Sequence, residues 1–419
     1  MTRPGDGRAI AAGVVAGIVG FAGAFAVVLS GLRGVGASPA EAASGLMTLS
    51  VLMGLGSIAL ALRTRMPVAV AWSTPGAALL ATSGVPDGGF PEAIGAFLLC
   101  GVLLVLAGLW RPLGDLVDRI PAAIAAAMLA GVLLPLCLEP ARAIGPVPEL
   151  ALPVIAAWAL VLRFARPWAV PVALVVAVAA VLATHDVDLG PVSGLTPTLA
   201  FTAPHFDLAT TLGLGVPLFI VTMASQNVTG MTVLSGFGYR PPWRPSIGGT
   251  GALTVIGAPF GAHAINLAAI TAALVAGPEA HPDPARRWVA AVGNGIACML
   301  LGLFAAAATA FLAASPPELL GTVAGLALLA ALGPALANAM SDPGVREAAL
   351  ITFAVSASST TLAGVSSSFW GLVAGCAFLG LTRERNSPDA PPRQRHAGAP
   401  RAPAPTSSPA PGAAPRTSS

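Results

Sequence analysis

Two polar stretches inside otherwise apolar segments hold the residues best suited to chemistry. One is the run WSTPG, and the other is the run GAHAIN. Hydroxyl, amide and imidazole groups are neutral hydrogen-bond donors, whereas proline and glycine interrupt helices. This combination predicts non-covalent binding of a small anion at a break in a helix. The candidate residues are Ser73, Thr74, Pro75, Gly76, His263 and Asn266.

Two further pairs of residues are candidates for ligand contact. Gln226 and Asn227 lie within a long apolar segment, and neighbours on a helix point about 100° apart, so at most one faces a cavity directly. Phe21 and Phe25 are four residues apart, a spacing that places both rings on one helix face and could form an apolar wall. The structural alternatives stay open: an interhelical hydrogen bond for the amides and ordinary packing for the rings.

His263 is the candidate proton carrier, because histidine titrates near pH 6.5 and no aspartate or glutamate lies plainly in the middle of an apolar segment. The alternative is a neutral ring that caps a broken helix. The sequence lacks the H-E-x-x-H and G-x-S-x-G patterns and any phosphate-cradling loop, so an enzyme is not expected. The four cysteines have no C-x-x-C spacing, and we expect no metal and no cofactor.

The composition is that of an integral membrane protein. Of the 419 residues, 55% are hydrophobic and only 9% are charged, against about 25% charged in soluble domains. All 21 basic residues are arginines, and those between the apolar runs lie in short loops rather than in a basic stripe with aromatics, a pattern that argues against nucleic-acid binding. The run over residues 9–32 is longer than a signal peptide's apolar region and predicts a first transmembrane helix. Residues 386–419 are rich in Pro, Ala, Ser and Arg and predict a disordered cytoplasmic tail.

Hydropathy predicts an all-α protein with about fourteen spans, since a span needs about 20 apolar residues. By the positive-inside rule, loops rich in arginine lie in the cytoplasm, and this orientation of the spans predicts that both termini are cytoplasmic. The polar stretch 185–207 separates two repeats of seven spans, residues 9–184 and 208–381, and an odd number of spans per repeat inverts one against the other. The expected spans are 9–32, 40–62, 67–83, 90–109, 120–138, 149–165, 168–184, 208–235, 246–260, 262–277, 287–313, 318–340, 345–364 and 366–381.

The two polar stretches fall on the third span of each repeat, which makes spans 3 and 10 discontinuous. Interrupted spans at matching positions are typical of a transporter's substrate site. Helices that start in mid-membrane, after Pro75 and after His263, would aim free N–H groups and positive dipole ends at an anion. On this interpretation Pro75→Ala abolishes transport. The alternative is that Pro75 merely kinks a helix.

The stretches MPVAVAWSTPGAALLA, MASQNVTGMTVLSGFGYRPP and GAPFGAHAINLAAITAAL resemble signatures of the bacterial benzoate/proton symporter (BenE) family, from about residue 9 to residue 383. That family is similar in fold to nucleobase/ascorbate and sulfate-permease transporters. The resemblance implies a core domain, residues 9–109 plus 208–313, and a gate domain, residues 120–184 plus 318–381. It also places Gln226 and His263 where uracil/proton symporters have glutamates, a departure that leaves the proton carrier open.

The expected function is therefore uptake of benzoate, or a similar aromatic carboxylate, with a proton by alternating access. The expected location is the bacterial inner membrane. The expected partners are the small aromatic acid, the proton and the lipid bilayer, with no nucleic acid and with a homodimer left open. The alternative is a proton-coupled carrier of another small organic anion or nucleobase-like substrate on the same fold. A channel is a further alternative.

Overall fold

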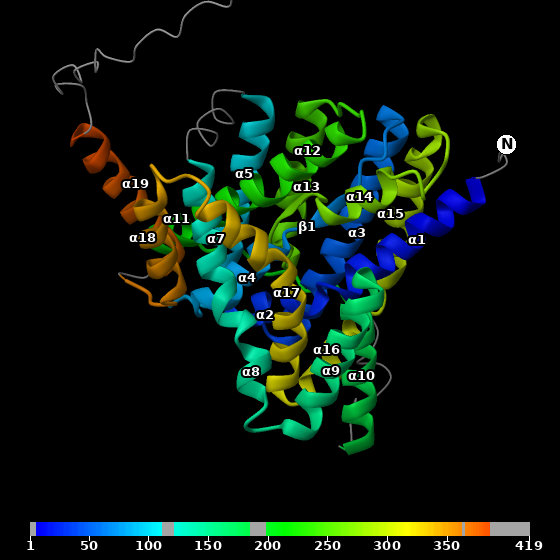
Figure 1. Cartoon of the computed structure of the whole chain (residues 1–419), viewed down its shortest axis with the longest axis horizontal. Coiled ribbons are helices and arrows are strands. Elements are labelled where there is room, and N and C mark those ends of the chain that lie inside the picture. The colour runs from blue at the N-terminus through cyan, green and yellow to red at the C-terminus, as the bar shows by residue number, and fades with distance from the viewer. Residues whose placement is uncertain (1–5, 111–120, 185–197, 363–364, 386–419) are drawn as a thin grey trace, which may run out of the picture. The chain divides into compact units, whose positions relative to one another are not determined.

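The computed structural model (Figure 1) describes residues 6–110, 121–184, 198–362 and 365–385, and these are mostly helical. Seven helical segments in the described part are long and apolar enough to cross a membrane. An eighth span results if Pro284–Gly302 and Ala305–Phe311, which are bent by 53°, are counted together. The seven segments are Asp6–Gly34, Pro39–Thr64, Phe90–Leu109, Ala122–Ala143, Arg166–Thr184, Leu208–Gly236 and Pro317–Ala339.

In the first half, every segment predicted from hydropathy contains a described helix. The third segment is the exception in form, because a short strand precedes its helix. The elements are α1 (Asp6–Ala22), α2 (Phe25–Gly34), α3 (Pro39–Thr64), β1 (Val70–Trp72), α4 (Thr74–Ser83), α5 (Phe90–Leu109), α7 (Ala122–Cys137), α8 (Glu139–Ala143), α9 (Pro148–Phe164) and α10 (Ala169–Thr184), with a 3₁₀ turn, η1 (Arg166–Trp168), before α10.

The second half repeats this order, again with a strand before the helix of its third segment. Two π-helical turns and two 3₁₀ turns interrupt it. The elements are α11 (Leu208–Thr222), η3 (Met223–Asn227), α12 (Val228–Gly236), η4 (Arg244–Gly248), α13 (Gly249–Gly257), η5 (Ala258–Phe260), β2 (Ile265–Leu267), α14 (Ile270–Ala276), η6 (Pro284–Arg286), α15 (Trp288–Gly302), α16 (Ala305–Ala313), α17 (Pro317–Ala339), α18 (Arg346–Ala357) and α19 (Ser367–Arg385).

The first helix of each half is interrupted near its middle. In the first half, α1 ends at Ala22 and α2 begins at Phe25, and the turn between them contains Gly23. In the second half, the π-helical turn η3 separates α11 from α12. Such π-bulges often occur at functional sites. Hydropathy alone did not predict either interruption, because both lie inside continuous apolar runs.

Helices from the two halves pack directly against each other. Both α1 and α3 contact α15, α5 contacts α11 and α13, and α7 contacts α17 and α18. Glycines allow the close approach that is typical of membrane helices. For example, a Cβ atom added at Gly13 on α1 would collide with the backbone of Ala290 on α15. Figure 1 shows β1 among α3, α13 and α14.

The chain divides into two units. The first, Met1–Leu379, contains all the elements named above except the last part of α19. The second, Gly380–Ser419, contains that last part of α19 and residues 386–419. The predicted disordered tail coincides with residues 386–419 and lies outside the described residues.

Candidate functional site

The two interrupted spans meet through a short antiparallel pair of strands. In β1 and β2, Val70 pairs with Leu267, Ala71 with Asn266, and Trp72 with Ile265. Each strand leads into a half-length helix, α4 after β1 and α14 after β2. Since the strands run in opposite directions, the two helix starts lie at opposite ends of a ladder about 10 Å long. Two positive helix ends therefore flank one small region.

Ser73 is the N-cap residue of α4, a position where serine is favoured because its hydroxyl can accept a hydrogen bond from the first turn. Its Oγ accepts a hydrogen bond from the N–H of Gly76 at 3.1 Å, and its own N–H donates to the carbonyl of Ala264 at 3.0 Å. Pro75 lies in the first turn, where its missing N–H breaks no helical bond. Gly76 is bound to the cap and Pro75 lacks a donor, so within the described residues the Thr74 N–H is the donor of the first turn that has no partner. By contrast, α14 has no side-chain cap.

His263 lies ahead of β2, and the second half-helix begins only at Ile270. The imidazole is fully buried, and its Nε2 lies 3.0 Å from the carbonyl oxygen of Ser73. A carbonyl can only accept, so Nε2 carries the proton and donates. The Nδ1 atom has no hydrogen-bond partner among the described residues. The ring of Phe97 contacts the imidazole edge-on, with centroids 6.2 Å apart.

Two asparagines hold β2 in place. The Asn227 Oδ1 accepts from the N–H of Leu267 at 2.9 Å, and its Nδ2 contacts the sulfur of Met223 at 3.4 Å. The Asn266 carboxamide lies between the N–H of Ser73 and the carbonyl of Leu267. With its oxygen toward Ser73, the two distances are 2.9 and 2.8 Å. Both asparagine side chains are fully buried.

Gln226 and Thr74 differ from these residues, because each is partly exposed and neither side chain has a hydrogen-bond partner among the described residues. The adjacent amides Gln226 and Asn227 thus point in different directions, with Asn227 turned toward β2. Gln226 and Thr74 are the predicted site residues whose polar groups stay available for a ligand.

Aromatic rings form one side of the region. Phe21 and Phe25 stack with centroids 5.8 Å apart and an interplanar angle of 9°, although the helix is broken between them. The Trp72 ring packs on Phe21 at 5.3 Å. All three rings are at least nine-tenths buried. Flat apolar surface of this kind suits a substrate ring.

Two residues that contact this region escaped the sequence reasoning. Trp72 stands inside the WSTPG run, but the sequence pointed only to its neighbours in residues 73–76. Thr222 donates a hydrogen bond to the Ser73 Oγ at 3.0 Å. Its sequence setting, a threonine at the end of an apolar run, carries no signal, because the contact depends on two spans far apart in the chain.

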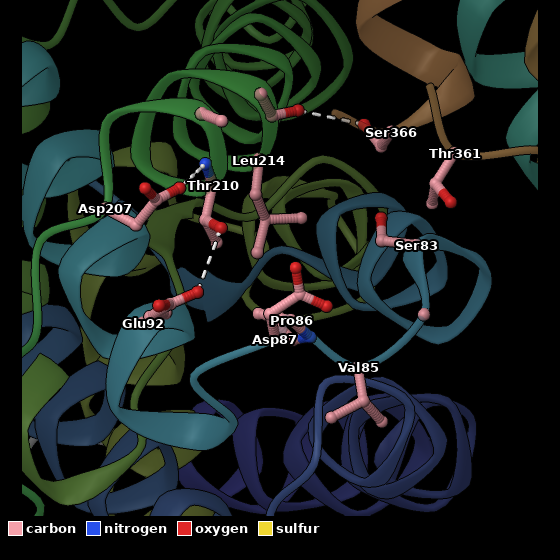
Figure 2. A pocket seen from close by; sticks show the side chains of 13 residues that line it. Ser83, Val85, Pro86, Asp87, Glu92, Asp207, Thr210, Leu214, Thr361 and Ser366 are labelled. Carbon is pink, nitrogen blue, oxygen red and sulfur yellow. Dashed lines mark hydrogen bonds between the residues drawn. The ribbon is translucent and has the colours of Figure 1, made fainter. Parts of the chain in front are cut away.

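A cavity of about 320 Å³ opens at the other end of α4 (Figure 2). Figure 2 shows Asp207, Thr210 and Glu92 on one side and Thr361 and Ser366 on another. The Thr210 hydroxyl donates a hydrogen bond to the Glu92 carboxylate at 3.0 Å. The backbone N–H of Thr210 donates to the Asp207 carboxylate at 2.8 Å, and this bond holds the pKa of Asp207 below its usual range. None of the ten predicted site residues lines the cavity. The ten-residue helix α4, about 15 Å long, separates the cavity from the strand pair.

The described residues contain no cluster of three or more His, Cys, Asp or Glu that could hold a metal ion. The groups at the strand pair are neutral donors, amides and aromatic rings. They can bind and orient a small organic anion, and they include no activated nucleophile or paired carboxylates.

Comparison with known proteins identifies relatives over almost the whole chain. Residues 5–381 match the family described as BenE, benzoate membrane transport protein. The inner membrane protein YdcO of Escherichia coli is 39% identical over 378 residues, which cover 90% of this chain and 96% of YdcO. The benzoate membrane transport protein of Acinetobacter baylyi is 30% identical over 364 residues, 87% of this chain and 92% of the relative.

Solved structures share the fold. The transmembrane domain of a cyanobacterial bicarbonate transporter, BicA, superposes with a TM-score of 0.59 at 16% identity, covering 90% of this chain and 98% of that domain. SLC26A9 gives a TM-score of 0.59 at 13% identity, covering 91% of this chain and 66% of the other. The predicted helical membrane fold with a seven-plus-seven inverted repeat is confirmed, and the short strand pair is a detail that the prediction lacked. The relatives and the fold are those of membrane transporters rather than enzymes. This chain is a multi-span membrane transporter and belongs to the benzoate membrane transport protein (BenE) family.

Proposed function

We propose that this transporter takes up benzoate, or a similar small aromatic carboxylate, together with a proton. The observation that carries the proposal is the pair of helix starts at the strand ladder, with the Phe21, Phe25 and Trp72 rings beside them. Helix N-termini attract a carboxylate without fixed positive charge, and the rings match an aromatic body. Membership of the benzoate transport family supports the same substrate class.

Within this region, Thr74 and Gln226 donate to the carboxylate, while the main chain of Pro75 and Gly76 shapes the helix start. The buried Ser73, His263, Asn266 and Asn227 hold that start in place through the hydrogen bonds described above. The substrate ring then lies against Phe21 and Phe25. All ten residues remain proposed site residues.

A proton is required for accumulation on electrostatic grounds. A carboxylic acid of pKa about 4 is an anion at neutral pH, and an inside-negative potential opposes its entry by about 2.3 kcal/mol per charge at 100 mV. One co-transported proton cancels that charge. His263 can take a proton at Nδ1, which has no partner among the described residues, without losing its Nε2 bond to Ser73.

Alternating access follows if the core domain (residues 9–109 plus 208–313) moves against the gate domain (residues 120–184 plus 318–381). The cell location proposed is the bacterial inner membrane with both termini in the cytoplasm. That placement is supported by the arginine distribution and by the inner-membrane relative. A homodimer is compatible with this arrangement.

The direct test is uptake of labelled benzoate into vesicles containing the purified protein. Uptake should rise with an inward proton gradient and fall when a protonophore is added. Protein-free vesicles give the passive leak of the neutral acid. Uptake that is unchanged by the protonophore would contradict proton coupling. If nucleobases compete with labelled benzoate more strongly than unlabelled aromatic acids do, the substrate is nucleobase-like and the proposed substrate class is wrong.

The role of His263 has its own test. In His263→Ala, benzoate uptake should weaken modestly and its dependence on external pH should flatten, because the proton position is gone. A pH profile identical to that of the wild type would show that the substrate or another residue, rather than His263, carries the proton.

A further inference from the structure

The π-helical turn η3 changes which residues of its span face the interrupted segments. In a regular α-helix, the residue four positions after Thr222 shares its face, and that residue is Gln226. In η3 the N–H of Val228 instead bonds the carbonyl of Met223, five residues back. The extra residue in this turn brings Asn227, rather than Gln226, onto the face that Thr222 occupies.

The resulting stripe touches both interrupted spans. Above the bulge, Leu218 lies so close to Gly76 that a Cβ atom there would be 2.6 Å from its Cδ1, and Thr222 donates to the Ser73 Oγ at 3.0 Å. Below the bulge, Asn227 accepts from the Leu267 N–H at 2.9 Å. Thr222 and Asn227 are both fully buried.

The Thr222 bond also fixes what Ser73 can do chemically. A serine hydroxyl has two acceptor positions and one donor hydrogen. Gly76 and Thr222 fill both acceptor positions of Ser73, and the described residues include no acceptor for its hydrogen. The Ser73 Oγ can therefore accept no further hydrogen bond, and Thr222 and Gly76 together fix the position of this capping oxygen.

We infer that Thr222 and Asn227, aligned by the π-bulge, are positioning residues. Thr222 holds the α4 cap, and with it the first turn in which Thr74 is proposed to donate to the carboxylate, and Asn227 holds β2. The expected effect on benzoate binding rests on the proposed function, whereas the role of Thr222 and Asn227 in holding the two segments is independent of it.

The transport test compares Thr222→Val, which keeps the shape and removes the hydroxyl, with Thr222→Ser, which keeps the hydroxyl. Thr222→Val should raise the KM for benzoate about tenfold while kcat stays within about twofold, and Thr222→Ser should restore the wild-type KM. Thr232→Val is the matched control, because the Thr232 hydroxyl bonds only its own helix, at the carbonyl of Val228. Equal KM values for Thr222→Val and Thr232→Val would overturn the role of Thr222.

A second measurement needs no substrate. Hydrogen exchange on the purified protein should quicken at the Gly76 amide in Thr222→Val and at the Leu267 amide in Asn227→Leu. Gln226→Leu, a change to the neighbouring unpartnered amide, should leave Leu267 protected. Wild-type exchange at both amides would refute the positioning role even if benzoate is transported. Faster exchange in a protein that takes up no benzoate would refute the proposed function alone.

Discussion

At the scale of single residues, Ser73 connects segments that are far apart in the sequence. Its N–H donates a hydrogen bond to the Ala264 carbonyl, its own carbonyl accepts one from the His263 Nε2, and its hydroxyl caps α4. The sequence indicated that these residue types belong together. It did not indicate that His263 would be committed to a carbonyl and fully buried, because that depends on the pairing of β1 with β2.

Gly76 should be intolerant of even one added carbon. A Cβ atom there would lie 2.7 Å from the Ser73 Oγ and 2.6 Å from the Leu218 Cδ1. In Gly76→Ala the cap must shift, and losing such a cap costs about 1 kcal/mol. We expect benzoate uptake to fall about fivefold, the equivalent of about 1 kcal/mol, with normal membrane insertion. Gly249→Ala is the control, since a Cβ atom at Gly249 meets nothing within 4 Å. Equal uptake by the two variants would contradict the tight fit.

At the scale of elements, hydropathy and arginine positions predicted where the helical segments lie, because a span needs a long apolar run. The interruption of the third span in each half was also predicted, from WSTPG and GAHAIN. The strands β1 and β2 were not, since three-residue strands exist only through pairing with each other. The π-bulge η3 was missed for a similar reason: its MASQN sequence is compatible with a regular helix.

The bounds of α4 change the expectation for Pro75. The sequence suggested that Pro75→Ala abolishes transport, as expected if the proline itself breaks the helix. In the structure, Pro75 lies in the first turn of α4, and Ser73 already caps that turn. Alanine there breaks no backbone hydrogen bond and adds one free N–H at the helix start. We now expect uptake within about threefold of the wild type, as for Pro39→Ala in the first turn of α3. If Pro75→Ala inserts normally but transports nothing, the proline ring itself is required.

At the scale of the whole molecule, the inverted repeat fixes which loops share a side of the membrane. If both termini lie in the cytoplasm, as proposed, the loop after α4 faces outward and the loop after α14 faces inward. Cys376, the exposed native cysteine of the described residues, is first replaced by serine. An impermeant maleimide applied to intact cells should then label Val85→Cys and leave Glu279→Cys unlabelled, although both positions are exposed. The reverse result would invert the topology.

The cavity at the C-terminal end of α4 lies beside a contact that the proposed motion of core against gate must change. Gly213 on α11 belongs to the proposed core, and Val365 and Ser366 belong to the proposed gate. The Ser366 Oγ donates to the Gly213 carbonyl at 2.9 Å, as Figure 2 shows beside Leu214. A Cβ atom built at Gly213 would lie 2.9 Å from the Val365 Cβ, so the two segments are in contact although Gly213 has no side chain.

A disulfide across this contact should stop transport reversibly. Cβ atoms in disulfides are about 3.8 Å apart, and Gly213→Cys with Val365→Cys reaches that separation with a small shift. Once oxidised, the pair joins core to gate, so benzoate uptake should fall to the level of empty vesicles and return on reduction. Gly213→Ala with Val365→Ala, which has both Cβ atoms but no sulfur, should transport in both conditions. If the oxidised pair, verified by mass spectrometry, transports at the reduced rate, these two surfaces stay together throughout the cycle, and the boundary between moving and fixed parts lies elsewhere.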